Sequence, residues 1–121
     1  MTAQPTPSGR SVLLRFLPPE TDETGTFGRD ADLDAAEVLT AVGRLPVNLA
    51  VFTVPAGSAT PPDSHQSHEM WLVQSGHGRV RCGDREHVVG PGALVALPGG
   101  EVHRLHAGPE EMTVVSLWWQ P

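Results

Sequence analysis

The strongest constraint on the fold is a series of short β-prone runs that begins after Pro46 and continues through Trp119. The runs are VNLAVFTV, EMWLVQS, GRVRC, EHVVG, GALVALP, VHRLHA and MTVVSLWW. The turn residues Gly, Pro and Asp separate them at intervals of about 8 to 12 positions, which is typical of an all-β sandwich or barrel. Thirteen Gly and twelve Pro among 121 residues also argue against a helical bundle. We therefore predict a small β-barrel or jelly roll.

The N-terminal part of the chain differs in composition and in hydrophobic pattern. Residues 1–10 are rich in Pro, Ser and Thr and predict a flexible N-terminus. Residues 11–18 (SVLLRFLP) predict a short strand, and residues 20–29 a loop. Residues 30–43 (DADLDAAEVLTAVG) predict a short helix, because apolar residues recur at helical spacing after an acidic first turn. The length of the chain suits one core, so we assign residues 11–121 to a single domain.

Composition narrows the class of protein. The net charge is −6, and a chain with eight arginines and no lysine offers no basic patch for nucleic acid. No apolar run approaches the roughly 20 residues needed to span a bilayer, and the start of the chain lacks an apolar leader segment. Cys82 is the lone cysteine, which excludes an internal disulfide and fits a reducing cytoplasm. It stands in GRVRCGDRE, beside a predicted turn, and we expect it to be a strand residue. A nucleophilic role would need an activating base that the sequence does not identify.

Residues 61–76 (PPDSHQSHEMWLVQSG) concentrate polar side chains that could bind a metal ion. If this stretch is extended, Asp63, His65 and Glu69 point to one side and His68 points to the other, because side chains alternate with a period of two. The order HxxHE also differs from the HExxH pattern of zinc proteases, which excludes that class. This stretch therefore predicts three convergent ligands.

A second cluster follows in GPGALVALPGGEVHRLHAG. His103 comes after the rigid turn at residues 98–100, and His106 has the opposite parity. Two imidazoles and a carboxylate suit a divalent first-row metal ion, here Fe, Zn, Mn or Ni, with coordination positions left open. Two strands of a barrel can supply such a set because the side chains on their inner faces all point toward the barrel axis. We predict one metal ion per chain.

These residues resemble the two sequence motifs of the cupin superfamily. In the first motif Gly57 opens the pattern, His65 takes the second histidine position, Glu69 the glutamate position, and Gly76 closes it. The second motif is matched, at the right spacing, by Gly92, Pro98, Gly100 and His103. The resemblance covers about residues 55–107. It implies a small single-domain metal-binding cupin, whose fold is a double-stranded β-helix or jelly-roll barrel.

The chain departs from the cupin pattern at three points. Asp63 stands in the first histidine position, the loop after Gly57 is slightly long, and Ala107 replaces the final asparagine. The resemblance thus implies that His65, Glu69 and His103 bind the metal, while Asp63 is either a fourth ligand or a catalytic base. The alternative is a degenerate cupin whose polar pocket residues only hydrogen-bond one another.

Resemblance to small cupins leads to a functional hypothesis. We expect a metal-dependent enzyme acting on a small metabolite, with oxygenase, isomerase, cyclase or N–N-forming chemistry. The stretch around Asp63 is also similar to cupins of bacterial natural-product pathways, including those of hydrazine synthases. An alternative is a non-catalytic cupin that binds a metal or ligand as a sensor or binding module. A third hypothesis is a structural partner protein that uses the barrel as an interface.

Several apolar and polar side chains are expected to surround this site. His68 and His106 are expected to be surface histidines or to orient a metal ligand by a hydrogen bond. Of Trp118 and Trp119, one is expected to fill the core and the other to seal a homodimer interface, because adjacent strand residues face opposite sides. The apolar walls of the site are predicted to be Val51, Trp71, Val73, Val95 and Leu97.

Overall fold

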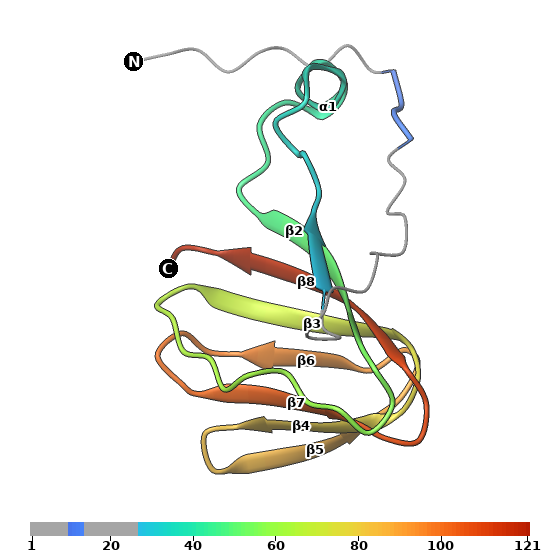
Figure 1. Ribbon diagram of the computed structural model, residues 1–121. Coiled ribbons are helices and arrows are strands. Elements are labelled where there is room, and N and C mark those ends of the chain that lie inside the picture. Colours follow the sequence, from blue (N-terminus) through green and yellow to red (C-terminus); the bar gives the residue numbers. More distant parts are fainter. Residues whose placement is uncertain (1–9, 14–26) are drawn as a thin grey trace.

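The computed structural model describes residues 10–13 and 27–121, which form eight strands and one short helix (Figure 1). The elements are β1 (Phe27–Asp30), α1 (Ala36–Val42), β2 (Asn48–Val54), β3 (His68–Ser75), β4 (Gly78–Cys82), β5 (Arg85–Val89), β6 (Leu94–Leu97), β7 (His103–Ala107) and β8 (Met112–Trp119). The predicted runs after Pro46 each correspond to one of the strands β2 to β8. Alternating apolar residues and turn-forming glycines were therefore sufficient to locate them.

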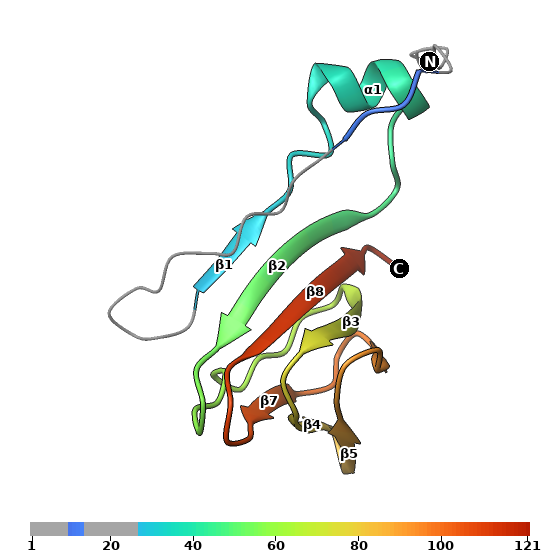
Figure 2. The same cartoon turned by 90° about the vertical axis from the view of Figure 1, so that its right-hand side faces the viewer.

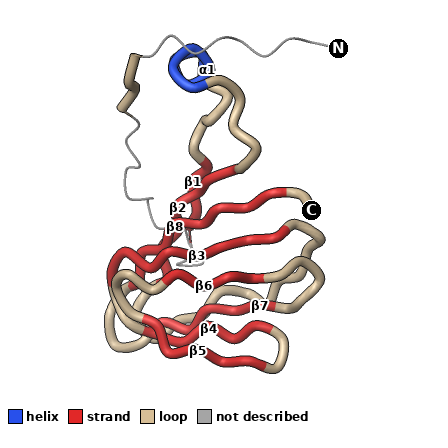
Figure 3. Tube along the Cα trace, turned by 180° about the vertical axis from the view of Figure 1, so that it is seen from behind, coloured by secondary structure: helices blue, strands red, loops and turns tan. Residues whose placement is uncertain are grey.

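The strands form two antiparallel sheets (Figure 3). The larger sheet has the order β1-β2-β8-β3-β6, and the smaller has the order β5-β4-β7. Strands that are consecutive in the sequence are often not adjacent in the sheets. For example, β8 lies between β2 and β3, and β7 pairs with β4. This interleaving is the jelly-roll arrangement, so the predicted all-β fold class with a short N-terminal helix is confirmed.

The core lies between the two sheets and draws residues from β2 to β8. Its buried members are mostly branched aliphatic residues, which pack well on pleated strands. They are Val54, Trp71, Val73, Val80, Val89, Val95, Leu97, Leu105, Met112 and Val114. Gly76 ends β3 with a φ of 82°, and a Cβ there would collide with the carbonyl oxygen of Glu111. A glycine is therefore required where the chain turns from β3 to β4.

The helix is shorter than predicted, and it lies apart from the two-sheet body at the far end of β1 and β2 (Figure 2). It starts at Ala36 instead of residue 30, because the Asp32 carboxylate accepts the Asp34 N–H in a local turn that competes with helix. The predicted loop at residues 20–29 is wrong at its end, where β1 begins. Within the described ranges, no helix is long and apolar enough to cross a membrane.

The N-terminal predictions fall largely outside the described residues. Residues 1–9, from the segment predicted to be flexible, and residues 14–18, from the predicted strand, are not among them. Residues 11–13 of that predicted strand are described and have no regular secondary structure.

Candidate metal centre

Two segments that are far apart in the sequence are joined beside the inner face of the larger sheet. The backbone of Asp63 pairs with that of His103 in both directions, with N···O distances of 3.1 and 2.9 Å. One further bond runs from the Gly100 N–H to the His65 carbonyl oxygen at 2.7 Å. The loop that leads into β3 is therefore fastened to the turn that leads into β7, and both carry predicted ligands.

His68 strengthens this junction from the side away from the ligands. Its Nδ1 accepts the Gly99 N–H at 3.0 Å, so the ring holds the turn before His103. Gly99 must lack a side chain here, because a Cβ would collide with the carbonyl oxygen of Gln66. The opposite parity of His68, read from the sequence, thus corresponds to a supporting contact.

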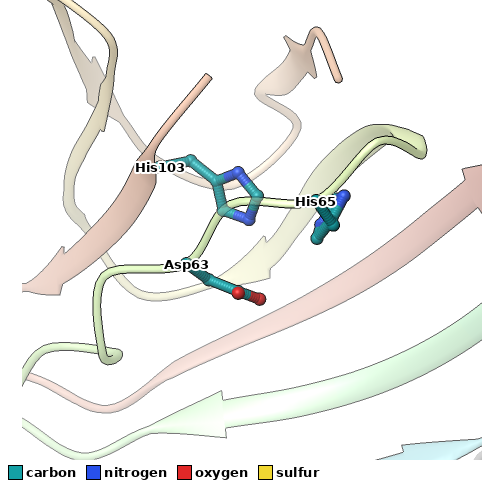
Figure 4. A group of neighbouring side chains, drawn as sticks. All are labelled: Asp63, His65 and His103. Atoms are coloured by element: carbon teal, nitrogen blue, oxygen red, sulfur yellow. The ribbon is translucent and has the colours of Figure 1, made fainter. Parts of the chain in front are cut away.

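The predicted ligands meet at this junction in two overlapping sets that share the two histidines. Atoms of Asp63, His65 and His103 that can bind metal lie within 4.8 Å of one another, around one space (Figure 4). Glu69 reaches the same place from β3: its Oε1 is 2.9 Å from His65 Nε2 and 3.5 Å from His103 Nε2. Donors that share one ion at about 2.0–2.2 Å lie roughly 3–3.5 Å apart. The two distances from Glu69 to the histidines fit a common cation, whereas the limit for the set with Asp63 is wider.

The hydrogen bond of His65 fixes which of its nitrogens faces the site. Nδ1 lies 2.9 Å from the Ser67 carbonyl oxygen, which can only accept, so Nδ1 carries the proton. A ring with a single proton then presents the lone pair of Nε2 to a carboxylate oxygen of Glu69. Two facing acceptors are stable only with a second proton or a cation between them. Metal-bound histidines are commonly oriented by such a bond from the other ring nitrogen.

His103 supplies the most deeply buried of the predicted ligands. Its side chain is 4% exposed, against 12% for Glu69 and 32% for His65. Its Nδ1 is buried and has no hydrogen-bond partner among the residues that the structure describes. The other ring nitrogen, Nε2, is the one that lies 3.5 Å from Glu69 Oε1.

Glu69 is held by its second oxygen. Oε2 accepts the indole N–H of Trp71 at 2.6 Å and the Ser116 hydroxyl at 2.5 Å. Trp71 follows Glu69 by two positions on β3, and Ser116 lies opposite Trp71 on β8. All three side chains therefore occupy the inner face of the sheet, and Oε1 is left toward the two histidines.

A cavity of about 430 Å³ adjoins these groups. It is lined by Ala50, Phe52, Asp63, His65, Ser67, Glu69, Ser116 and Trp118. The walls predicted from the sequence are wrong: Val73, Val95 and Leu97 lie in the core, as does most of Trp71. Val51 alternates with Ala50 and Phe52 on β2 and so faces away from the cavity.

The prediction for the terminal tryptophans is also corrected in part. Neither Trp118 nor Trp119 belongs to the buried core; both are half-buried. Trp118 lines the cavity, because the end of β8 extends beyond the core and its inner face meets that space. Trp119 faces outward, with its ring 6.2 Å from that of His68. The homodimer that was predicted from this residue stays a prediction.

The sequence reasoning missed Phe52, Trp118 and Ser116 as residues of the site. Parity alone could have suggested Phe52 and Trp118, once β8 was known to lie between β2 and β3. For Ser116 no local signal exists, since a serine between apolar residues is ordinary in a strand. Its place beside Glu69 depends on the register of β3 and β8.

A family model described as "Cupin domain" matches residues 50–119 of this chain. The matched range runs from the third residue of β2 to the end of β8 and therefore includes all the residues of the candidate centre. An uncharacterized protein of Streptomyces coelicolor is 24% identical over 75 residues, which is 62% of this chain and 71% of that protein.

Solved structures agree in fold. A Cupin 2 conserved barrel domain protein from Salinispora arenicola superposes with a TM-score of 0.71 at 18% identity, covering 92% of this chain and 91% of that one. A recombinant oxalate oxidase in complex with glycolate has a TM-score of 0.69 at 19% identity, covering 86% of this chain and 56% of that one. At such identities the likeness concerns the barrel alone.

Proposed function

This chain belongs to the cupin domain family, and on that premise we propose that it is a metal-dependent enzyme acting on a small metabolite. His65, Glu69 and His103 would hold one divalent first-row ion, and Asp63 would be a fourth ligand or a base. The barrel resembles that of an oxalate oxidase, which supports catalysis as one use of such a fold without assigning that substrate here.

One observation carries the proposal: the Nε2 atoms of two imidazoles lie beside a single carboxylate oxygen, Glu69 Oε1. The Ser67 carbonyl orients His65 so that its Nε2 lone pair faces Glu69 Oε1, and His103 Nε2 lies 3.5 Å from that same oxygen. Imidazole and carboxylate donors together suit Fe, Mn, Ni or Zn.

The chain's own residues would bind, orient and shield the substrate. When bound, the metal ion would polarise a substrate oxygen or lower the pKa of a bound water. Phe52 and Trp118 line the cavity and would exclude water from the apolar part of a ligand. Asp63 is exposed beside the ligands and also lines the cavity, so its carboxylate could take up a proton from substrate.

A non-catalytic metal- or ligand-binding cupin is the second candidate. Asp63 favours it as a further possible ligand beside the two histidines, since a site whose coordination positions are all filled by protein groups can bind an ion without turnover. Exchange of bound water distinguishes the two. Protein loaded with Mn(II) should enhance water proton relaxation if coordination positions are open. A loaded site without enhancement would favour a binding module.

Metal content per chain tests the proposal directly. Protein purified without an affinity tag or chelator should contain about one equivalent of a first-row metal by mass spectrometry. His103→Ala should lose the metal. His87→Ala, which changes an exposed histidine in the middle of β5, should retain it. Absence of metal in the unaltered chain, even after reconstitution with Fe, Zn, Mn and Ni salts, would contradict the proposal.

A further inference from the structure

We propose that Trp71 and Ser116 are positioning residues that hold the Glu69 carboxylate in the one orientation able to complete the metal centre. The inference rests on the proposed function and deepens it, because it concerns residues outside the four predicted ligands. Two donors from two strands meet on a single oxygen, Oε2, at 2.6 and 2.5 Å. Hydrogen bonds to a charged carboxylate are roughly twice as strong as neutral ones.

The two donors leave the carboxylate little freedom. A glutamate side chain has three rotatable bonds, and a partial rotation about any of them would move Oε2 away from its two donors. Such a rotation would break both bonds in a buried place, since Trp71 is 4% exposed and Ser116 is 3% exposed. An unpaired donor there costs about 1–3 kcal/mol. Oε1 is therefore kept toward His65 and His103.

Trp71 also touches a second predicted ligand. Its ring packs edge-to-face against His103, with centroids 5.3 Å apart and planes at 88°. On its other side it meets Phe52 at 5.4 Å, in the wall of the cavity. One indole thus sets the positions of Glu69 and His103 relative to each other, which explains why a tryptophan, with its N–H, stands in the core at this position.

The hydrogen bond can be tested without metal by ¹H–¹⁵N spectroscopy of the indole groups. The chain has three tryptophans, and the Trp71 signal is identified by its loss in Trp71→Phe. We expect this signal to be shifted downfield and to move upfield in Glu69→Gln, while the Trp119 signal stays in place. If the chemical shift of the Trp71 indole signal is the same in Glu69→Gln as in the unaltered chain, the inference is overturned.

Metal titration tests the consequence for binding. With Co(II) or Zn(II), Trp71→Phe and Ser116→Ala should each weaken binding about 10- to 100-fold, as outer partners of metal ligands do. Trp119→Phe and Ser75→Ala are matched controls on the outer face and at the exposed end of β3, and should stay within about twofold. Ser116→Thr keeps the hydroxyl and should restore most of the affinity.

A double-mutant cycle separates positioning from general loosening of the fold. If both residues act through Glu69, their effects on affinity should largely vanish in a Glu69→Gln background. Equal losses in both backgrounds would overturn the inference. If the unaltered chain binds no metal, the proposed function fails, while the indole spectra still decide whether Trp71 holds Glu69.

Discussion

The cavity beside Glu69 and the seam between β5 and β6 both contain carboxylates and an imidazole, but they hold these groups differently. The seam is the larger hollow, about 640 Å³ against 430 Å³. Its titratable side chains are Cys82, Asp84, Arg85, His87 and Glu101, and all but Cys82 are exposed. In the described part of the chain, metal-binding atoms of three residues gather within 4.8 Å only at Asp63, His65 and His103.

The difference follows from where the side chains point. At the cavity, inner-face residues of two sheets and a fastened loop point to one space, and hydrogen bonds orient His65 and Glu69. At the seam, two edge strands lie beside each other without pairing, and their polar groups face water. The volume of a hollow and the residue types around it therefore do not by themselves create a binding site. A binding site needs side chains that point to one space and are held in a fixed orientation.

The largest contrast is expected from removing one imidazole at each place. His65→Ala should weaken Zn(II) binding by more than about 100-fold, beyond the range typical of outer partners, because a donor itself is lost. His87→Ala in the seam should leave affinity unchanged. Isothermal titration of both variants checks this, and similar affinities would remove the distinction between the two hollows.

A smaller but still large effect is expected from Gly99→Ala. The new Cβ would collide with the Gln66 carbonyl and separate the two fastened segments. Overpacking of this kind costs about 1–3 kcal/mol of unfolding free energy. Denaturant unfolding should show that loss together with weaker metal binding, and Ser64→Ala, at an exposed residue of the same loop, should show neither. Unchanged stability would mean that the loops adapt freely.

Asp63→Asn should have a milder effect on metal affinity, below about 10-fold, the lower end for an outer partner. Asp63 is exposed, and its Oδ1 already accepts the Ser64 N–H at 2.9 Å. If the carboxylate serves as a base, turnover should fall much further than affinity once a substrate is known. A loss of affinity as large as that of His65→Ala would instead identify Asp63 as a full ligand.

The smallest effect concerns Cys82 in the seam. Burial, with a lesser contribution from the Glu101 charge, raises the pKa of its thiol. Alkylation requires the thiolate, so at pH 8 iodoacetamide should react more slowly with Cys82 than with a free cysteine, and the rate should keep rising at higher pH. Glu101→Gln should lower the pKa and modestly speed the reaction. A rate equal to that of free cysteine would contradict this account.

The predicted elements and the observed ones agree best where a local rule decides the outcome. Strands β3, β4 and β8 were located almost to the residue, because alternation and turn-forming glycines act over a few positions. The helix was overextended, since side chains such as Asp32 compete for backbone groups in a way that periodicity does not register. The predicted wall of the cavity was wrong because alternation along a strand tells which residues share a face but not which face lines the cavity. Only the packing of the two sheets decides that.

The ligand set shows the same division. Asp63, His65, Glu69 and His103 were identifiable from motif spacing. The structure groups Asp63 with the two histidines and places Glu69 against both histidines. Their role in binding metal stays a prediction. The contacts of Ser116 and His68 could not be predicted, because each depends on a partner more than 30 positions away.

By itself, the sequence of this protein determined where strands run, where glycine must turn the chain, and which side chains share a face. These are short-range properties, since they depend on backbone sterics and on a period of two. Only the tertiary structure decided that β8 lies between β2 and β3, that Ser116 lies opposite Trp71, and that the Asp63 loop is fastened to the turn before His103. Such pairings are chosen by burial of the whole core, which no local stretch encodes.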